Sequence, residues 1–415
     1  MQRATTRTLA ALGSAALVGM TAGAAFAAPT TVASGVQYEL IDTWSKDRLN
    51  QILTTDFPKF AGVKRDYGQA QHGVKLFRVT YPSVIPEKSN KAIVATGLLA
   101  IPDHLDLSRA QALPLLSYQH GTVYGKQEVP SMPENSPEMQ LMLAQFGGQG
   151  YAVIGADYFG MGNSKEPEGY MVKASHQQST LDMLRAGRAV LGSWKVSTPE
   201  LFLSGWSQGG FVTMAFLERL EKEGIPVCAA VTASAPTDVY GLLSGFLLYP
   251  RPIDASWVNS VVILSAFSFE QYYNVPGLTT DLFQPAHYEL VKKAYLREPV
   301  DVSKLPMDLK QLVQPQYFQP HYLAQSPYGK LLSHSSVYRW NFQTPLRNYY
   351  GEADEAIPTG IGQMAMRYQQ SVGNGNPKVQ AISTGATNHR GTYAVAAAAW
   401  KPHFDALRSG KGCTP

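Results

Sequence analysis

The sequence predicts an α/β protein with a doubly wound, mostly parallel sheet. From Val74 onward, short apolar runs typical of buried strands alternate with segments of helical periodicity. This alternation is typical of a parallel sheet covered by helices on both faces, and right-handed crossovers make such a sheet doubly wound. The alternation stops between about Thr237 and Gln343 and then resumes. We therefore expect one sheet whose chain is interrupted by an insertion.

The expected elements follow from apolar runs and from residues that begin or end helices. Val74–Tyr81 and Ala92–Ile101 are expected to form a strand pair. Further strands are expected at Leu113–Tyr118, Tyr151–Ala156, Leu201–Leu203, Val227–Ala233, Leu346–Tyr350 and Val379–Ser383. Helices are expected at Pro137–Phe146, Thr180–Trp194, Gln208–Glu223, Ile361–Gln370 and Thr392–Leu407. Ser136 is placed to cap the first helix, and Gly224 is placed to end the third.

The insertion, residues 237–344, is expected to be a largely helical cap that follows the sixth strand. Residues 28–236 and 345–415 would then form the two parts of the core. A separate domain is the alternative, but the insertion lacks linker-like ends and the sheet needs the strand that follows it. The apolar side chains of the insertion either line a ligand pocket or form the cap's own core. They include Phe246, Leu247, Leu248, Tyr249, Trp257, Phe267, Phe269, Tyr272 and Tyr273.

Composition excludes several classes of protein. The 415 residues are 45% hydrophobic and 11% aromatic, which is typical of a globular protein with a large core. Charged residues make up 16%, the formal net charge is +4, and there is no run rich in Lys and Arg. We therefore expect no nucleic-acid partner.

Residues 1–27 have the pattern of a secretory signal peptide. Arg3 and Arg7 form a positive region, Leu9–Gly19 is apolar, and Ala25-Phe26-Ala27 has the small-x-small pattern of a cleavage site. An uncleaved anchor is the alternative, but the apolar run is rich in Ala and Gly and is weakly hydrophobic for a permanent span. We expect cleavage after Ala27 and a secreted or periplasmic protein.

The chain has two cysteines, Cys228 and Cys413. In an oxidising compartment they could form one disulfide between the C-terminus and the body of the protein. The alternative is that Cys228, which lies in an apolar run, is a buried free thiol. An unpaired Cys413 in the polar tail would be exposed, so the sequence favours the disulfide.

The motif Gly205-Trp206-Ser207-Gln208-Gly209 lies where an expected strand meets an expected helix. A nucleophilic serine needs this context, because a sharp strand-to-helix turn exposes its oxygen above the sheet. Glycines on either side remove side chains that would collide in the turn. The N–H of Gln208 can then point at a developing oxyanion. Ser207 is therefore the candidate nucleophile.

Together with other motifs, this turn resembles those of the α/β-hydrolase superfamily, and within it bacterial secreted esterases and lipases that have a large cap. The resemblance covers roughly residues 74–407 and rests on His120-Gly121, Asp157–Gly162, Ser207, Asp354 and His389. Nucleophile, acid and histidine occur in the chain order of that family. The resemblance implies a serine hydrolase of carboxylic esters that acts through a Ser-His-Asp triad and an acyl-enzyme.

The resemblance assigns Asp354 as the acid, because it lies between an expected strand and an expected helix. Glu352 and Glu355 are neighbouring competitors. Asp238 is an alternative, since some relatives have the acid after the preceding strand. A structural role for Asp354 as a helix N-cap is also open.

His389 is the expected base, in a polar loop between the last strand and the last helix. The other histidines after Ser207 fit less well, since His287, His321 and His334 lie in the insertion and His403 lies within the last helix.

The resemblance also places the oxyanion hole at the backbone N–H groups of Thr122 and Gln208. Gly121 would allow the backbone to approach closely, and His120 is expected to be structural rather than catalytic.

The sequence shows no zinc-binding pattern and no phosphate-binding glycine loop, so we expect no metal and no cofactor. The expected substrate is a small-molecule or lipid ester. A lipase whose cap contacts a lipid interface and an esterase for small esters both remain open. A serine peptidase, an acyltransferase and a non-catalytic binding protein of the same fold are less favoured alternatives.

Overall fold

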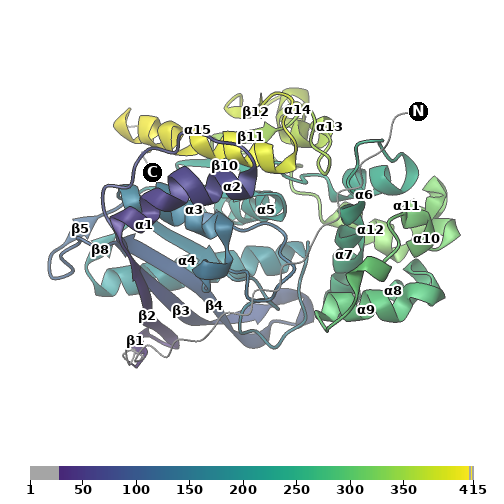
Figure 1. Ribbon diagram of the computed structural model, residues 1–415, viewed down its shortest axis with the longest axis horizontal. Coiled ribbons are helices and arrows are strands. Elements are labelled where there is room, and N and C mark those ends of the chain that lie inside the picture. Colours follow the sequence, from purple (N-terminus) through teal and green to yellow (C-terminus); the bar gives the residue numbers. More distant parts are fainter. Residues whose placement is uncertain (1–27, 411–412, 414–415) are drawn as a thin grey trace.

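The computed structural model describes residues 28–410 and 413, and within them ten strands form one sheet (Figure 1). The expected signal peptide lies outside the described residues. The strands are β1 Thr30–Ala33, β2 Val36–Trp44, β3 Val74–Ile85, β4 Lys91–Pro102, β6 Leu115–Gln119, β7 Ala152–Ala156, β9 Leu201–Trp206, β10 Ala229–Ala233, β11 Leu346–Tyr350 and β12 Val379–Ser383. A separate small pair is β5 Gln111–Ala112 and β8 Val196–Ser197.

The strand order is β1-β2-β3-β4-β7-β6-β9-β10-β11-β12. Neighbours from β1 to β7 are antiparallel, whereas β7, β6, β9, β10, β11 and β12 are parallel to one another. The predicted mostly parallel sheet is therefore confirmed. All eight predicted strands are present, with β11 and β12 at the predicted bounds.

Strands β1 and β2 were not predicted. They form the antiparallel edge of the sheet, where most of their side chains are exposed or half-buried and give no clean alternation. Because of them, the insertion follows the eighth strand of the described sheet instead of the sixth. The predicted strand number, six, was counted from Val74, where the strand and helix pattern in the sequence begins.

Strand β3 is longer than predicted and continues through Pro82 to Ile85. It pairs with β4 along its whole length, but its pairing with β2 ends at Thr80. Beyond Thr80, β3 is paired with β4 on one side and has no β2 partner on the other, so this part of β3 is an edge. Pro82 lacks an N–H and can occupy such an edge.

Helices cover both faces of the sheet. One face packs on α4 (Lys173–Ser193) and α5 (Gln208–Lys222), and the other packs on α1 (Lys46–Gln51), α2 (Phe57–Ala61), α3 (Pro137–Gln145) and α15 (His389–Ser409). Two separate buried clusters of apolar side chains lie between these layers and the sheet. Two shorter helices, α13 (Thr359–Gly362) and α14 (Met364–Ser371), connect β11 to β12.

Helix α4 begins two turns before the predicted Thr180. Its first residues include Ser175, His176 and Gln177, which are polar yet buried. Gln177 Nε2 donates to the carbonyl of Ala215, and Ser175 Oγ donates to Glu87. The turn is therefore held by specific hydrogen bonds, and hydrophobic periodicity could not reveal it.

The insertion forms a helical layer at one end of the sheet (Figure 1). Its helices are α6 Val239–Leu248, α7 Asn259–Tyr273, α8 Leu278–Leu282, α9 Tyr288–Leu296, α10 Leu309–Leu312, α11 Pro320–Gln325 and α12 Pro327–His334. Phe267 stacks on Phe283 and Tyr295, with ring centroids 5.7 and 5.1 Å apart. Many of the aromatic side chains therefore form the cap's own core.

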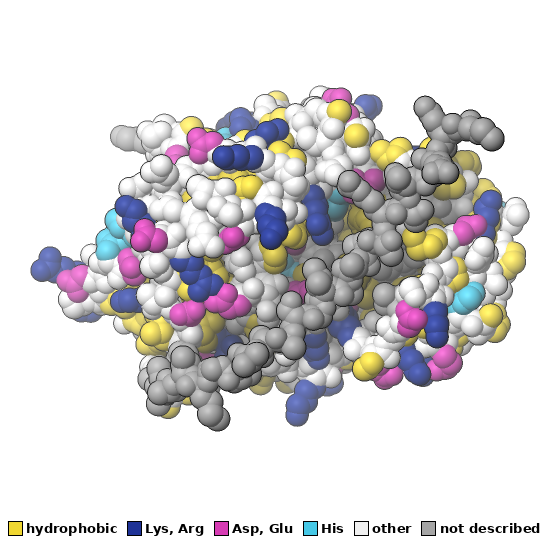
Figure 2. Space-filling view, in the orientation of Figure 1, with side chains coloured by type: hydrophobic (Ala, Val, Ile, Leu, Met, Phe, Trp, Pro, Cys, Tyr) yellow, Lys and Arg dark blue, Asp and Glu magenta, His cyan; other side chains and the backbone are white. Residues whose placement is uncertain are grey.

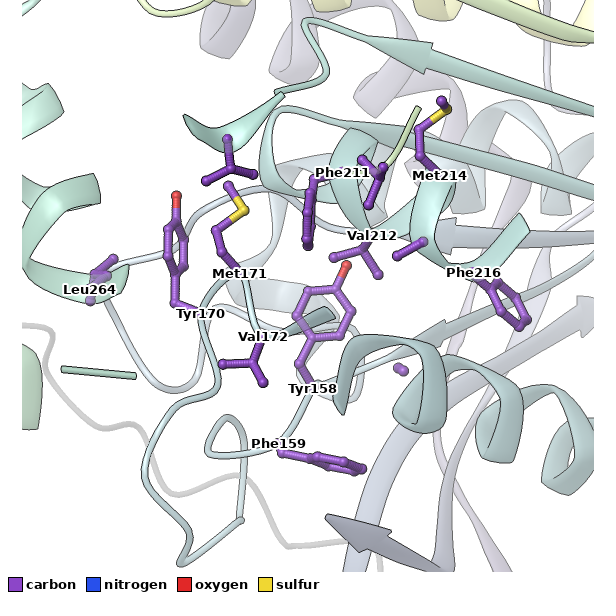
Figure 3. Close-up of a cluster of buried hydrophobic side chains, with 14 of the residues drawn as sticks. Tyr158, Phe159, Tyr170, Met171, Val172, Phe211, Val212, Met214, Phe216 and Leu264 are labelled. Carbon is purple, nitrogen blue, oxygen red and sulfur yellow. The ribbon is translucent and has the colours of Figure 1, made fainter. Parts of the chain in front are cut away.

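The segment that precedes α4 connects this cap to the sheet. Tyr170, Met171 and Val172 are buried beside Phe211 of α5 and Leu264 of the cap (Figure 3). This packing builds one wall of the site at the end of β9.

Candidate active site

Ser207 stands between the end of β9 and the start of α5, in a strained backbone conformation. Its φ is 57° and its ψ is −123°, values that few residues other than glycine adopt. The Ser207 N–H donates to the carbonyl of Ala233 at 3.0 Å, which anchors the turn to the next strand. The side-chain oxygen therefore projects beyond the sheet instead of lying within it.

The glycines of the motif are required by close contacts. A Cβ at Gly205 would lie 2.2 Å from the carbonyl oxygen of Gly209. A Cβ at Gly209 would lie 1.9 Å from the carbonyl oxygen of Gln119. Both neighbours are backbone atoms that cannot rotate away, so α5 can approach the sheet only because these positions are glycine.

The structure brings Ser207, His389 and Asp354 together. His389 Nε2 lies 2.9 Å from Ser207 Oγ, and His389 Nδ1 lies 3.1 Å from each carboxylate oxygen of Asp354. The predicted loop position of His389 is wrong, since His389 is the first residue of α15. Asn388 caps that helix by accepting from Gly391 N, so the histidine is held on a rigid element.

Asp354 is buried and fully hydrogen-bonded. Its Oδ1 accepts from the N–H groups of Ala356 and Ile357 at 2.9 Å each, and its Oδ2 accepts from Ser234 Oγ at 2.6 Å. Burial alone would raise the pKa of Asp354. The charge of His389 and these hydrogen bonds outweigh burial and hold its pKa below the ordinary value. The carboxylate is therefore maintained as an anion beside the imidazole.

The competing carboxylates have other partners. Asp238 caps α6 by accepting from Gly241 N at 3.0 Å. Glu352 accepts from Ser383 Oγ, and Glu355 accepts from the backbone N–H of His389 at 2.8 Å. Glu355 thus supports the position of the histidine without reaching its ring.

The expected oxyanion loop lies beside Ser207. Thr122 and Ser207 line the same cavity, and Thr122 Oγ1 lies 2.9 Å from Tyr170 OH. His120 is buried and stacks on Tyr158 with centroids 4.0 Å apart, and its Nδ1 lies 2.8 Å from the carbonyl of Gly121. Burial lowers the pKa of His120 to about 4, so this ring is neutral and structural.

Ser207 and His389 open into a cavity of about 500 Å³, which we call the open cavity. Its volume is typical of small-molecule sites. It is lined by Thr122, Tyr124, Trp206, Ser207, Trp257, Glu355, Asn388, His389 and Arg390.

Several residues of this site were missed by sequence reasoning. Ser234 follows β10 and contacts Asp354 from 120 positions away. Glu138, on α3, is buried and accepts a hydrogen bond from Gly121 N in the expected oxyanion loop. Arg251, in the cap, donates to the carbonyl oxygen of Asp354 at 3.1 Å. Only the position of Ser234 at a strand end carried a signal, since strand ends of a parallel sheet gather at one edge.

Comparison with known proteins agrees with this architecture. No protein-family model and no curated protein sequence matches the chain. Among solved structures, the chain is similar to a provisionally assigned hydrolase of Legionella pneumophila, with 21% identity, a TM-score of 0.77, and coverage of 89% of this chain and 97% of that one. It is similar to the rice cell wall degrading esterase LipA of Xanthomonas oryzae, with 22% identity, a TM-score of 0.72 and coverage of 90% and 96%.

The chain has the α/β-hydrolase fold. A more distant similarity joins it to Candida antarctica lipase A in its closed state, with 13% identity, a TM-score of 0.59 and coverage of 91% and 83%. At 13–22% identity, these similarities show the fold.

Among the described residues, no group of three or more His, Cys, Asp or Glu side chains is arranged to hold a metal ion. No helix in that part of the chain combines the length and apolarity needed to cross a bilayer. On the face shown in Figure 2, Lys and Arg side chains are interspersed with Asp and Glu.

Proposed function

We propose that this protein hydrolyses carboxylic esters, with Ser207 as nucleophile, His389 as general base and Asp354 as the residue that orients His389. The observation that carries the proposal is the continuous set of contacts from Ser207 Oγ to His389 at 2.9 Å and from His389 to Asp354 at 3.1 Å. These contacts end in the open cavity, where a substrate can reach the serine.

The reaction proceeds in two halves. His389 Nε2 takes the proton of Ser207 Oγ while that oxygen bonds to the carbonyl carbon of the ester. The bond to the alcohol oxygen then breaks, and the alcohol leaves with the proton from His389. Water attacks the acyl-enzyme by the same route, which releases the carboxylic acid and restores Ser207.

Asp354 accepts a hydrogen bond from the Nδ1–H of His389 and so holds the proton on Nδ1. Nε2 is then free to accept the serine proton. The N–H groups of Thr122 and Gln208 would donate to the carbonyl oxygen as it gains negative charge. Gln208 begins α5, so its N–H also lies at the positive end of a helix dipole.

Ser207→Ala tests the proposal. We expect turnover of p-nitrophenyl acetate to fall by at least about a thousandfold, because the nucleophile is removed. Ser204→Ala is the matched control, since Ser204 lies on the same strand and its buried hydroxyl has no hydrogen-bond partner among the described residues. Substantial activity in Ser207→Ala would refute the assignment.

A fluorophosphonate probe separates this enzyme from a binding protein. The wild type should be labelled at Ser207, and absence of labelling in the folded protein would favour a non-catalytic role. Faster cleavage of aminoacyl amides than of esters would favour a peptidase, and transfer to an added alcohol in preference to water would favour an acyltransferase.

We also propose that the protein is exported, on the basis of the signal-peptide pattern in residues 1–27. Expression in a bacterial host with a secretion pathway should yield a mature chain that begins at Ala28. Intact residues 1–27 on the isolated protein would contradict cleavage.

A further inference from the structure

Ser207 lies at the junction of two cavities of very different size. Besides the open cavity of about 500 Å³, Ser207 and Thr122 line a second space of about 20 Å³, which we call the narrow cavity. Apart from the hydroxyls of Thr122, Tyr170 and Ser207, the walls of the narrow cavity are mostly apolar, and they come mainly from the segment before α4, the cap and the loop after Asp354. They include Met171, Leu242, Phe246, Val258, Val261 and Ile357.

The position of His389 shows which half of an ester enters each cavity. The alcohol oxygen must receive its proton from His389 Nε2, so the alcohol lies on the histidine side of Ser207. His389 lines the open cavity together with its neighbours Asn388 and Arg390. It is absent from the described residues that line the narrow cavity. The narrow cavity therefore faces the acyl half of the substrate.

The size of the narrow cavity limits the acyl group. A cavity needs at least about 10–15 Å³ to hold one water, so the narrow cavity, at about 20 Å³, has room for a short acyl group and little room for a long chain. Its mostly apolar walls favour an alkyl group, since the Thr122 and Tyr170 hydroxyls that also line it lie 2.9 Å from each other as a hydrogen-bonded pair.

Resting on the proposed esterase function, we propose that this enzyme is selective for short acyl groups, acetyl above all, carried by bulky alcohols. The alcohol enters the open cavity between the aromatic side chains of Tyr124 and Trp257 and the polar groups of Glu355 and Arg390. A short acyl pocket distinguishes an esterase of this kind from a lipase that acts on long-chain lipids.

Phe246 and Val258 form a partition that sets the depth of the acyl pocket. Both are buried, with 5% and 4% exposure. Both line the narrow cavity, and both also line a further space of about 150 Å³ within the cap, which we call the cap cavity. Removing the Phe246 ring would join the two spaces and extend the acyl pocket into the cap.

The first experiment measures kcat/KM for p-nitrophenyl acetate, butyrate and octanoate with the wild type. We expect kcat/KM to fall by about tenfold or more from acetate to octanoate, since a pocket that lacks room for added methylenes discriminates on that scale. Equal or faster hydrolysis of octanoate would overturn the short-acyl proposal but leave the esterase proposal intact. Failure to hydrolyse any ester in the series would instead refute the proposed function.

The second experiment compares Phe246→Ala with Leu247→Ala. Leu247 is the next residue on α6, is equally buried, and lines the cap cavity but is absent from the described lining of the narrow cavity. We expect Phe246→Ala to raise the octanoate-to-acetate ratio of kcat/KM by about tenfold, and Leu247→Ala to leave the ratio unchanged.

Thermal unfolding of both variants serves as the control for folding, because each substitution removes a large buried side chain. An unchanged ratio in folded Phe246→Ala would overturn the partition. If Phe246→Ala does not fold, Val258→Ala applies the same test, with an increased ratio expected and an unchanged ratio overturning the proposal.

Discussion

The carboxylate of Glu138 accepts a hydrogen bond from the backbone N–H of Gly121 at 2.8 Å, directly before Thr122. The same oxygen accepts from Tyr118 OH at 2.5 Å. A Cβ at Gly121 would lie 2.9 Å from this carboxylate, so only glycine allows the loop backbone to approach Glu138 this closely. A buried acid on α3 thus fixes the backbone of the expected oxyanion loop.

Glu138 makes stability depend on pH. Burial raises its pKa from 4.5 to about 7, against the lowering effects of hydrogen bonds from Tyr118 and Gly121 and of the charges of His389 and Arg390. The folded state therefore holds a proton that the unfolded chain loses between about pH 4.5 and 7. Stability from this group is present below that window and is lost as pH rises through it.

Glu138→Gln should remove this dependence, since an amide oxygen can still accept from Gly121 and does not titrate. Between pH 5 and pH 8, we expect the unfolding free energy of the wild type to fall by on the order of 2 kcal/mol more than that of the variant. Urea unfolding at the two pH values measures the difference. Glu134→Gln is the control, because its carboxylate is exposed and paired with Arg48. Parallel pH curves for wild type and Glu138→Gln would contradict the expectation.

Asp354→Asn should reduce kcat on the order of a thousandfold, because the amide cannot hold His389 in the productive tautomer. Asp238→Asn should change kcat little, since Asn caps a helix about as well as Asp. Steady-state kinetics of the two variants distinguishes the acids that the sequence left open. A larger loss in Asp238→Asn would reverse the assignment.

Ser234→Ala should lower kcat by about tenfold with little change in KM, because one hydrogen bond to a charged group is lost. That hydrogen bond helps to keep the pKa of Asp354 low. Without it the pKa rises, and Asp354 becomes protonated at a higher pH. On acidification, the variant should therefore begin to lose activity at a higher pH than the wild type does, which a pH-rate profile measures. A profile that superimposes on wild type would show that Ser234 has no positioning role.

Cys228 and Cys413 are both half-buried, and their side chains lie within hydrogen-bond reach of each other. Burial and the neighbouring Cys413 raise the pKa of the Cys228 thiol. In oxidising conditions we expect a disulfide, and its reduction should cost about 2–4 kcal/mol of unfolding free energy. Thiol titration of the denatured protein detects it. Two free thiols in protein isolated from an oxidising compartment would contradict the pairing.

Local chemistry made much of this fold predictable. The turn at Ser207 needs glycines at fixed positions and a strand and helix on either side, and all of these are adjacent in sequence. The central strands β6, β7, β9 and β10 are predictable because they are buried along their whole length and are therefore mostly apolar. The half-exposed β1 and β2 lack that pattern, and the first turns of α4 are polar. Hydrophobic patterning therefore did not predict either.

Chain order, through the family resemblance, selected Ser207, Asp354 and His389 as candidates, and the structure has their side chains in contact. The sequence misplaced His389 in a loop because helix starts depend on capping, here by Asn388, more than on hydrophobic periodicity. The tertiary structure alone decided that Ser234 contacts Asp354, that Glu138 contacts Gly121, and that Phe246 and Val258 line the narrow cavity beside Ser207. These contacts join residues far apart in the chain, and their energies depend on distances that no local pattern encodes.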